Sequence, residues 1–536
     1  MKKITLFASL LLVAGITFCQ NNNSQALAKW SDARFGMFIH WGPVSLKGTE
    51  IGWSRGKEVP TEEYDNLYKQ FNPVNFNADE WVSVAKAAGM KYIVLTTKHH
   101  DGFCLWDTKQ TDYNIMQSPF KRDVVKELSD ACKKQGIAFG AYYSTCDWHH
   151  PDFPLYGAGG KNRKEKSDLD AYTNYLKRQI AELMLNYGPL FTLWFDVPQQ
   201  FDDARGKGIL DFAHIIQPDI VINSRTGTKG DYDTPEQRVG GIQMNRPWES
   251  CFTIGKQWAW KPNENLKSLR QCINTMISAV SGDGNFLFNV GPSPLGVIEP
   301  DQVARLKNMG KWLEENSESI YGTRGGPFVA GKTLSSTRKD SAIYLHTLNS
   351  KSEKITIPAL PANILSVSVL SGKKLKFKQS KTITEIALPA ELQDSISTTV
   401  KIVIDKPAIE IPLIDLNEQY IFTASSNSSS AAQMNDGSTN SLSNWKADAK
   451  DSIPWGIIDL RKPITISKVS IYEGSNSKIT KFTVEYKKGN DWFNIFEGNE
   501  INNKIDCDFE KVKTQFVRIK YIKFTKSPII REIEIQ

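Results

Sequence analysis

Short apolar runs alternate with amphipathic stretches over the first 330 residues. The runs at 91–97 and 191–196 are aromatic or β-branched and carry little charge, as do strands that are buried on both faces. Stretches 78–89 and 124–136 place apolar residues at helical spacing and end at glycine. Repeated strand–helix units of this size predict parallel strands joined by right-handed crossovers. We therefore predict an α/β fold with a (β/α)₈ TIM-like barrel over residues 28–330.

A different pattern follows the barrel region. Glycine and proline at 325–327 interrupt the chain, and short alternating segments such as 342–346 and 400–404 come next. Alternation with period two, bounded by turn residues, is typical of β-sandwiches. We predict one β-sandwich over residues 333–405 and a second over residues 415–536.

The first 19 residues have the pattern of an export signal. Two lysines precede an apolar run at 4–18, which is too short to cross a bilayer. We predict a signal peptide over 1–19 and export to the periplasm or outer membrane of a Gram-negative bacterium, or secretion. Cys19 stands where a lipidated cysteine would, although Phe18 precedes it instead of a small residue, so a lipid anchor stays open. No later segment predicts a transmembrane helix.

Composition narrows the class of protein. Hydrophobic residues make up 40% and charged residues 23% of 536 residues, with a net charge of +7, which fits a soluble globular protein. The largest basic group, 161–166, is interpreted as a solvated loop, so we expect no nucleic-acid partner. Seven cysteines are scattered without CxxC spacing. We interpret the six after Cys19 as small core residues, with a disulfide framework as the alternative.

Polar and aromatic residues gather where the predicted strands end, which is where barrel enzymes place their chemistry. Five of the seven histidines fall at these ends or just beyond them: His40, His99, His100, His149 and His150. Tryptophans are interleaved with them: Trp41, Trp53, Trp148 and Trp194. Sugars present apolar faces that stack on aromatic rings and hydroxyls that need fixed hydrogen-bond partners. This barrel mouth therefore predicts a carbohydrate ligand.

Acidic residues in the same region indicate glycoside hydrolysis, which needs two carboxylates. Asp196 ends an apolar strand, where an unpaired carboxylate is costly to bury. Glu236 and Glu249, in loops beyond the fifth predicted strand, are candidates for the second. Arg225, at the end of that strand, is a candidate partner for a carboxylate or a sugar hydroxyl. The alternatives are a helix-capping aspartate, surface glutamates and a structural ion pair.

We expect no metal in the catalytic site. His99 and His100 are adjacent, and consecutive strand residues point to opposite faces, whereas metal-binding barrels bring alternate residues together. No glycine-rich motif indicates a nucleotide, so we expect no catalytic cofactor.

Eight runs occur in order along the barrel region: RFGMFIHWG (34–42), TTKHHDGF (96–103), AYYSTCDW (141–148), LWFD (193–196), NSR (223–225), GDYDTPE (230–236), GNFLFNVGP (284–292) and WLEENSESIYGT (312–323). They resemble glycoside hydrolase family 29 α-L-fucosidases. The resemblance implies a retaining, double-displacement mechanism on α-linked fucose, without a catalytic metal. It also implies Asp196 as nucleophile and Glu236 as acid/base, with Glu249 as second choice.

The resemblance further implies the fucose-binding residues, which are His40, Trp53, His99, His100, Tyr142, Trp194 and Arg225. Tyr143 is the alternative to Tyr142, because the register of that strand end is open. The runs at 247–250 and 258–260 resemble the subgroup that removes α-1,3- and α-1,4-linked fucose from branched, Lewis-type glycans. The loop 148–151 is a candidate contact for the neighbouring galactose.

Three other functions remain as alternatives: a broad or α-1,2/1,6-acting fucosidase, another barrel glycosidase such as an α-galactosidase, and a non-catalytic glycan-binding protein. Residues 415–536 resemble a discoidin-like carbohydrate-binding module, on runs at 435–439, 455–460 and 517–520. That resemblance implies a structural Ca²⁺ near the first loop and leaves sugar binding open. The partners we expect are fucosylated oligosaccharides or glycoconjugates. The sequence does not predict an oligomeric state.

Overall fold

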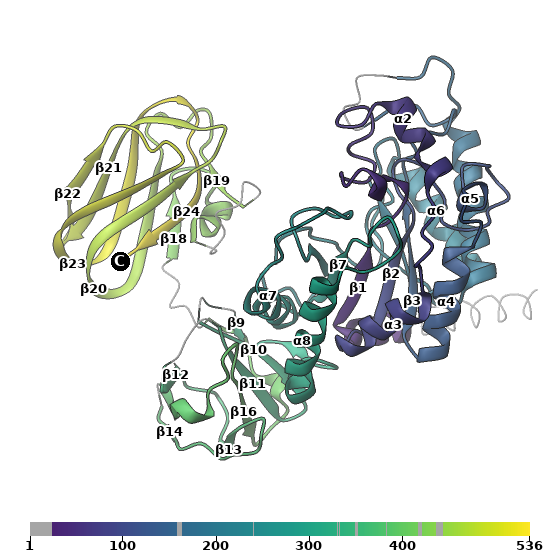
Figure 1. The fold of residues 1–536 in the computed structure, drawn as a ribbon. Coiled ribbons are helices and arrows are strands. Elements are labelled where there is room, and N and C mark those ends of the chain that lie inside the picture. The colour runs from purple at the N-terminus through teal and green to yellow at the C-terminus, as the bar shows by residue number, and fades with distance from the viewer. Residues whose placement is uncertain are drawn as a thin grey trace, which may run out of the picture. The chain divides into compact units, whose positions relative to one another are not determined.

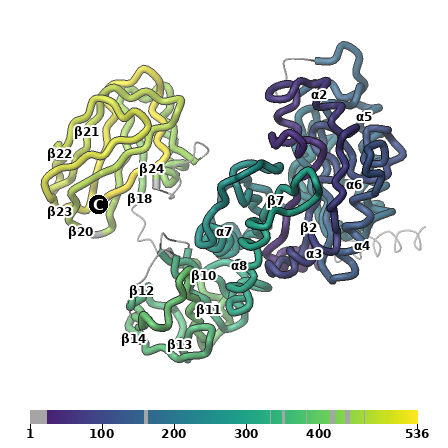
Figure 2. Tube along the Cα trace, viewed as in Figure 1, coloured from purple at the N-terminus to yellow at the C-terminus, as the bar shows by residue number. Residues whose placement is uncertain are grey.

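The fold is known from a computed structural model. It describes residues 24–157, 163–239, 241–329, 331, 333–348, 352–381, 383–415, 421–435 and 443–536. The chain divides into two compact units, residues 1–414 and 415–536 (Figures 1 and 2). The predicted signal peptide and Cys19 lie outside the described residues. Within these ranges no helix is long and apolar enough to cross a membrane.

A parallel sheet of seven strands forms the centre of the first unit, in the order β5-β4-β3-β2-β1-β7-β6. Along the chain the strands are β1 (Phe35–Ile39), β2 (Tyr92–Lys98), β3 (Ala138–Ser144), β4 (Thr192–Asp196), β5 (Val221–Ile222), β6 (Glu249–Thr253) and β7 (Asn285–Val290). Both neighbours of β1 are parallel to it, with Phe38 opposite Val94 on β2 and Asn289 on β7. The predicted α/β fold with parallel strands is confirmed.

Segment 231–237 links the two edges of this sheet. Its Tyr232 forms a parallel bridge with Asn223, just after β5, and its Glu236 forms one with Cys251 on β6. Backbone N–H groups complete the connection, because Asp231 donates to Ile222 (2.7 Å) and Gln237 to Cys251 (2.9 Å). The segment therefore occupies the eighth strand position and closes the ring, although it is not a regular strand.

Helices cover the outside of this ring: α3 (Ala78–Ala87), α4 (Val124–Gln135), α5 (Leu169–Tyr187), α6 (Asp203–Ile216), α7 (Leu269–Ser281) and α8 (Pro300–Asn316). Shorter turns lie in the loops: α2 (Thr61–Asn66), η1 (Pro43–Leu46), η2 (Leu67–Gln70), η3 (Ile115–Gln117) and η4 (Ser317–Ser319). Five of the long helices begin at a side-chain N-cap, namely Asn77, Asp123, Asp168, Asp202 and Ser268. Each cap accepts a hydrogen bond from a first-turn N–H, which fixes where the chain leaves the loops at the barrel mouth.

Two apolar layers hold the barrel together. Alternate strand residues point inward, and the inner layer is built mainly from aromatic and small side chains: Trp30, Phe38, Tyr92, Val94, Tyr142, Trp194, Val221, Tyr232, Cys251 and Leu287. The other strand residues pack outward against the helices in a larger cluster. The six cysteines after Cys19 are buried and free, as predicted from their spacing.

The first β-sandwich packs against the barrel within the same unit. One sheet has the order β13-β16-β11-β10-β8 and the other β12-β15-β14. Their bounds are β8 (Arg324–Gly325), β10 (Leu334–Lys339), β11 (Ala342–Thr347), β12 (Lys354–Pro358), β13 (Ile364–Val369), β14 (Phe377–Gln379), β15 (Ile383–Ala387) and β16 (Thr399–Ile404). The remaining elements are β9 (Phe328–Val329), η5 (Ala390–Leu392), η6 (Ala408–Glu410) and β17 (Ile414–Asp415). Trp312 on α8 donates to the carbonyl of Ser397 (3.2 Å), which ties this sandwich to the barrel.

The second unit is an antiparallel β-structure in the order β19-β24-β20-β23-β21-β22, with β18 paired to β20. Its elements are β18 (Ile421–Ala424), η7 (Ser428–Asn435), β19 (Trp445–Lys446), β20 (Trp455–Glu473), β21 (Lys478–Lys488), β22 (Asp491–Gly498), β23 (Lys504–Lys526) and β24 (Ile529–Ile535). Buried Trp445, Ile458, Val484 and Val517 belong to its own core. The predicted second sandwich is confirmed, whereas most of the run 435–439, expected near a Ca²⁺, lies outside the described residues.

Gly310 on α8 and Gly208 on α6 provide a matched stability test. A Cβ at Gly310 would lie 1.8 Å from the carbonyl oxygen of Ala87, but at Gly208 it would meet only Lys177 Nζ, at 3.9 Å. Gly310→Ala should lower the free energy of unfolding by about 1–3 kcal/mol, because two packed helices must separate. Gly208→Ala should raise it by about 0.5–1 kcal/mol, because glycine disfavours a helix interior. Denaturant titration measures both, and similar effects would contradict the close packing of α3 and α8.

Candidate active site

Asp196 is the last residue of β4 and lies at the C-terminal end of the barrel strands. Its Oδ2 accepts a hydrogen bond from Tyr142 Oη (2.9 Å), and its Oδ1 accepts from Arg225 Nη1 (2.7 Å). His100 Nε2 lies 3.8 Å from Oδ2. The backbone N–H of Val197 donates to Oδ1 (2.9 Å). The carboxylate is therefore held from several sides by side chains of neighbouring strands and loops.

Arg225 joins Asp196 to the second candidate carboxylate. Its Nη1 and Nη2 each lie 3.4 Å from Glu236 Oε2. Its Nε donates to Thr234 Oγ1 (2.7 Å) and its Nη2 to the Thr234 carbonyl (2.8 Å), so the guanidinium is fixed in one orientation. The guanidinium also lies 5.0 Å from the centroid of the Trp194 ring. Glu236 is 44% exposed at its side chain, whereas that of Asp196 is 13% exposed.

Electrostatics keep Asp196 ionised. Burial alone raises the pKa of this carboxyl, but the positive charge of Arg225, the nearby His100 and the hydrogen bonds from Arg225 and Tyr142 outweigh it. The net result is a pKa below the usual range for aspartate. The pKa of Arg225 is raised in turn, because the charge and hydrogen bond of Asp196 outweigh the cost of burial.

Three histidines surround this carboxylate, and the hydrogen-bond network assigns two tautomers. His40 Nδ1 lies 2.6 Å from Asn289 Oδ1, and the amide nitrogen of Asn289 already donates to the Trp258 carbonyl. The proton of His40 is therefore on Nδ1, which leaves Nε2 as an acceptor. The same reasoning places the proton of His100 on Nδ1, because the Ser144 hydroxyl, 2.7 Å away, donates to the Cys146 carbonyl.

Burial keeps these imidazoles neutral. It lowers the pKa of His40 to about 3 and that of His100 to about 4, against opposing contributions from Asn289 and Asp196. The pKa of His99 falls well below its ordinary value, first through burial and then through the two neighbouring imidazoles. The His99 ring stacks on Tyr142 at 5.4 Å, and its buried Nδ1 has no partner among the described residues. Neutral rings of this kind suit hydrogen bonding to uncharged hydroxyl groups.

Tryptophan rings line the site. Trp194 stacks on Tyr142 at 5.5 Å inside the barrel. Trp53 is 36% exposed and meets His100 at 5.3 Å and Trp148 at 5.5 Å, edge to face. Trp258 lies 4.8 Å from the His40 ring. The fucose-binding set expected from sequence is thus brought together around Asp196, and Trp258 joins it although sequence reasoning used that residue only for the subgroup.

Two acids, the half-buried Glu50 and the buried Asp101, anchor the loops that carry these tryptophans. Glu50 accepts hydrogen bonds from the backbone N–H groups of Trp258 (2.9 Å) and Ala259 (3.0 Å). Asp101 accepts from Tyr64 Oη (2.7 Å), which in turn accepts from the N–H of Gly52, next to Trp53 (2.8 Å). Glu50 and Asn289 were missed from sequence, although Glu50 lies three residues before Trp53 and Asn289 lies within the run GNFLFNVGP.

Other predicted residues lie elsewhere. Glu249 is not in a loop: it is the first residue of β6, at the opposite end of the barrel, and is fully buried. Tyr143 points outward and donates to Gln179 on α5 (2.6 Å), so Tyr142 is the residue at the site. In the loop 148–151, His149 stacks on Tyr113 and His150 packs on Tyr175. Trp148 is therefore the residue of this loop that lies at the barrel mouth.

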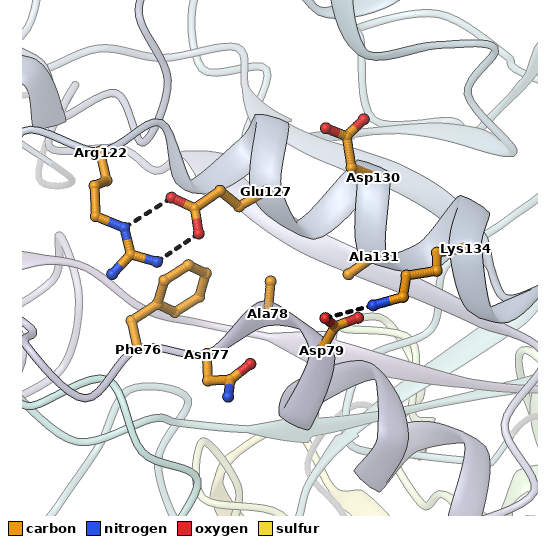
Figure 3. A pocket seen from close by; sticks show the side chains of 9 residues that line it. All are labelled: Phe76, Asn77, Ala78, Asp79, Arg122, Glu127, Asp130, Ala131 and Lys134. Carbon is orange, nitrogen blue, oxygen red and sulfur yellow. Dashed lines mark hydrogen bonds and ion pairs between the residues drawn. The ribbon is translucent and has the colours of Figure 1, made fainter.

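A separate surface groove of about 470 Å³ lies between α3 and α4 (Figure 3). Most of its charges are paired within the groove, since Arg122 binds Glu127 and Lys134 binds Asp79, whereas Asp130 pairs with Lys126 outside it. None of the residues predicted for the site lines it. The groove is therefore distinct from the barrel mouth.

An ionised aspartate at a strand end, a glutamate on the same guanidinium, neutral imidazoles and tryptophan faces define a barrel glycoside hydrolase. Residues 17–318 match the sequence model of the family "Alpha-L-fucosidase", and residues 421–533 match that of the "F5/8 type C domain". Human plasma α-L-fucosidase is 32% identical over 337 residues, which span 56% of this chain and 70% of the human one.

Solved structures give the same result. α-L-Fucosidase isoenzyme 1 from Paenibacillus thiaminolyticus is 30% identical, with a TM-score of 0.67 over 72% of this chain and 100% of that one. A family 29 enzyme from Bacteroides thetaiotaomicron, trapped as a covalent intermediate with 2-fluoro-fucosyl fluoride, is 26% identical, with a TM-score of 0.65 over 71% of this chain and 96% of that one. The chain belongs to the α-L-fucosidases of glycoside hydrolase family 29 and carries a discoidin-like F5/8 type C domain.

The neutral state of His40 predicts a pH-dependent stability. The unfolded chain protonates this histidine below about pH 6.5, whereas the folded chain does not until about pH 3. Its stabilising contribution is therefore present above pH 6.5 and lost as the pH falls. The free energy of unfolding of the wild type should fall by about 2–3 kcal/mol between pH 7 and 4.5, relative to that of His40→Gln, whose amide can still bond Asn289. Denaturant titrations of both proteins at these pH values measure the difference, and a constant difference would contradict a buried neutral imidazole.

Proposed function

We propose that this chain is a retaining exo-α-L-fucosidase with Asp196 as nucleophile and Glu236 as acid/base. The observation that carries the proposal is the shared contact with Arg225. Because Nη1 lies 2.7 Å from Asp196 Oδ1 and 3.4 Å from Glu236 Oε2, these two oxygens are about 6 Å apart at most. Retaining pairs are separated by about 5–5.5 Å and inverting pairs by about 6.5–9.5 Å, so the geometry favours retention.

Two displacements follow from these positions. Asp196 attacks the anomeric carbon of fucose while Glu236 protonates the departing glycosidic oxygen, which forms a fucosyl–enzyme ester. Glu236, now a carboxylate, takes a proton from water, and that water displaces Asp196 to release fucose with its configuration retained. The trapped covalent intermediate of the Bacteroides thetaiotaomicron enzyme, obtained with a glutamate-to-glutamine variant, supports the same sequence of steps here.

The environments of the two carboxyl groups suit different roles. The Asp196 side chain is 13% exposed and its pKa is lowered, so it is ionised and available for attack. Glu236 is 44% exposed, which lets it exchange protons with leaving group and water. Glu249 is enclosed beneath Trp194, which argues against contact with the leaving group.

The remaining residues form the fucose pocket in this proposal. His40, His99 and His100 offer neutral ring nitrogens to the sugar hydroxyls, and Arg225 adds charged donors. Tyr142 holds Asp196 and supports the His99 ring. Trp194 and Trp53 offer apolar ring surface to the methyl group and the ring of fucose.

Azide should separate the candidate acids. Asp196→Asn should lower kcat by roughly four orders of magnitude, since no covalent step remains. Glu236→Ala should lower it by about 10²–10⁴-fold, and azide should restore turnover with α-fucosyl azide as product, because azide needs no proton from a general base. Glu249→Ala is the matched control and should show no rescue. Rescue of the Glu249 variant alone would overturn the assignment.

We further propose that the substrates are α-1,3- and α-1,4-linked fucosides of branched glycans. The runs at 247–250 and 258–260 support this, and so does the aromatic rim made by Trp53 and Trp148, which offers stacking surface beyond the fucose itself. The second candidate is a broad or α-1,2/1,6-acting fucosidase. We also propose export of the chain, on the pattern of residues 1–19.

Product analysis tests the linkage. Fucose release from a Lewis-type trisaccharide should exceed release from an aryl fucoside and from α-1,2- or α-1,6-linked oligosaccharides by about tenfold or more in kcat/KM, because a second sugar adds binding in the transition state. Free fucose is measured by chromatography for each substrate. Equal rates on all of them would favour the broad enzyme, and galactose release from α-galactosides would contradict the sugar specificity.

A further inference from the structure

Glu249 has no role in the proposed mechanism, yet it is among the most completely buried acids of the barrel. It is the first residue of β6, and its register partner on β7 is Asn285, also the first residue of its strand. Asp196, by contrast, is the last residue of β4. Because the strands are parallel, Glu249 and Asp196 lie toward opposite ends of the barrel interior.

Both carboxyl oxygens of Glu249 are used. The indole Nε1–H of Trp194 donates to Oε1 (3.0 Å), and Tyr92 Oη forms a short hydrogen bond with Oε2. Trp194 is 1% exposed and Tyr92 is fully buried. These contacts give the indole one defined orientation, since the carboxyl group is itself held from its other side.

No cation offsets this buried acid among the described residues. The ionisable groups that face it are Tyr92, Tyr232 and Cys251, and burial raises the pKa of each, so all are neutral near pH 7. Burial also raises the pKa of Glu249 to about 7, although the hydrogen bonds from Tyr92 and Trp194 favour its charged form. An apolar side chain would fill this position at lower cost, so stability alone does not account for the carboxyl group.

Trp194 connects Glu249 to the reacting end of the barrel. Its ring backs the guanidinium of Arg225 at 5.0 Å and stacks on Tyr142 at 5.5 Å with an interplanar angle of 19°. Among the described residues, Arg225 and Tyr142 are the two side chains that hydrogen-bond to the Asp196 carboxylate. A tilt of the indole would therefore displace both partners of the carboxylate together.

We propose that Glu249 is a positioning residue, whose carboxyl group fixes the Trp194 indole so that Tyr142 and Arg225 hold Asp196 in line with the anomeric carbon. The inference rests on the proposed role of Asp196. It assigns to Glu249 no contact with substrate and no proton transfer to it.

Three variants test the role. Glu249→Gln keeps an acceptor for the indole and should retain kcat/KM within about threefold, with an unchanged pH profile. Glu249→Leu leaves the buried indole N–H unpaired and should lower kcat/KM by about 10- to 100-fold without azide rescue. Tyr92→Phe keeps the hydrogen bond between Glu249 and Trp194 but removes the second hold on the carboxyl group, so its loss of kcat/KM should be smaller than that of Glu249→Leu. Rates are normalised to active sites by titration with 2-fluoro-fucosyl fluoride, so that a loss of folded protein does not lower the rate per active site.

A double variant distinguishes positioning from a general contribution to packing. Trp194→Phe removes the indole N–H, so Glu249 no longer has an indole to position. Adding Glu249→Leu to Trp194→Phe should therefore lower the affinity for a fucose-configured iminosugar by less than about twofold beyond Trp194→Phe alone. Additive losses, or full activity of Glu249→Leu, would overturn the proposal, as would loss of activity in Glu249→Gln with azide rescue. Because Asp196 and Glu236 are tested by their own variants, failure here is distinguishable from failure of the proposed mechanism.

Discussion

A single guanidinium holds the candidate site together. Asp196 and Glu236 approach each other closely enough that two negative charges would repel and one would take up a proton. Arg225 lies between them and lowers the pKa of Asp196, while Thr234 prevents the guanidinium from rotating away. Asp196, the proposed nucleophile, can therefore stay ionised beside a second acid. The separation of the two carboxyl groups is also set by one rigid, planar group rather than by flexible loops.

That arrangement depends on the irregular closure of the barrel. Thr234 and Glu236 both belong to segment 231–237, which bridges β5 and β6 in place of a regular strand. Arg225 follows β5 directly, so the guanidinium and its anchors belong to adjacent positions of the ring. Residues two positions apart along a strand face the same side, and Thr234 and Glu236 accordingly both meet Arg225. The Glu236 side chain nevertheless stays half-exposed to water.

Much of the site could be predicted from sequence because the barrel rule is strong. His40, His99, His100 and Asp196 follow apolar strands, and parallel strands bring such ends together. Glu249 was misplaced for a local reason: the aspartates and proline of 231–237 do not resemble a strand, so the start of β6 was read as part of a long loop. The choice between Tyr142 and Tyr143 stayed open because adjacent strand residues differ only in the face they occupy. Glu50 and Asn289 act through backbone atoms of residues more than 30 positions away.

His99 has a buried ring nitrogen, Nδ1, without a hydrogen-bond partner among the described residues. A buried nitrogen without a partner costs free energy, and most native structures avoid it. Here the neighbouring position is Gly52, whose φ of +67° suits glycine and whose Cβ would lie 2.8 Å from His99 Nδ1. The hydrogen bond from Gly52 to Tyr64 holds that backbone in place without supplying a donor to the ring. The imidazole is thus enclosed closely enough to stay neutral, while its nitrogen remains unused by protein groups of the described chain. The unpaired nitrogen is therefore a cost to stability that the fold carries beside the proposed fucose pocket.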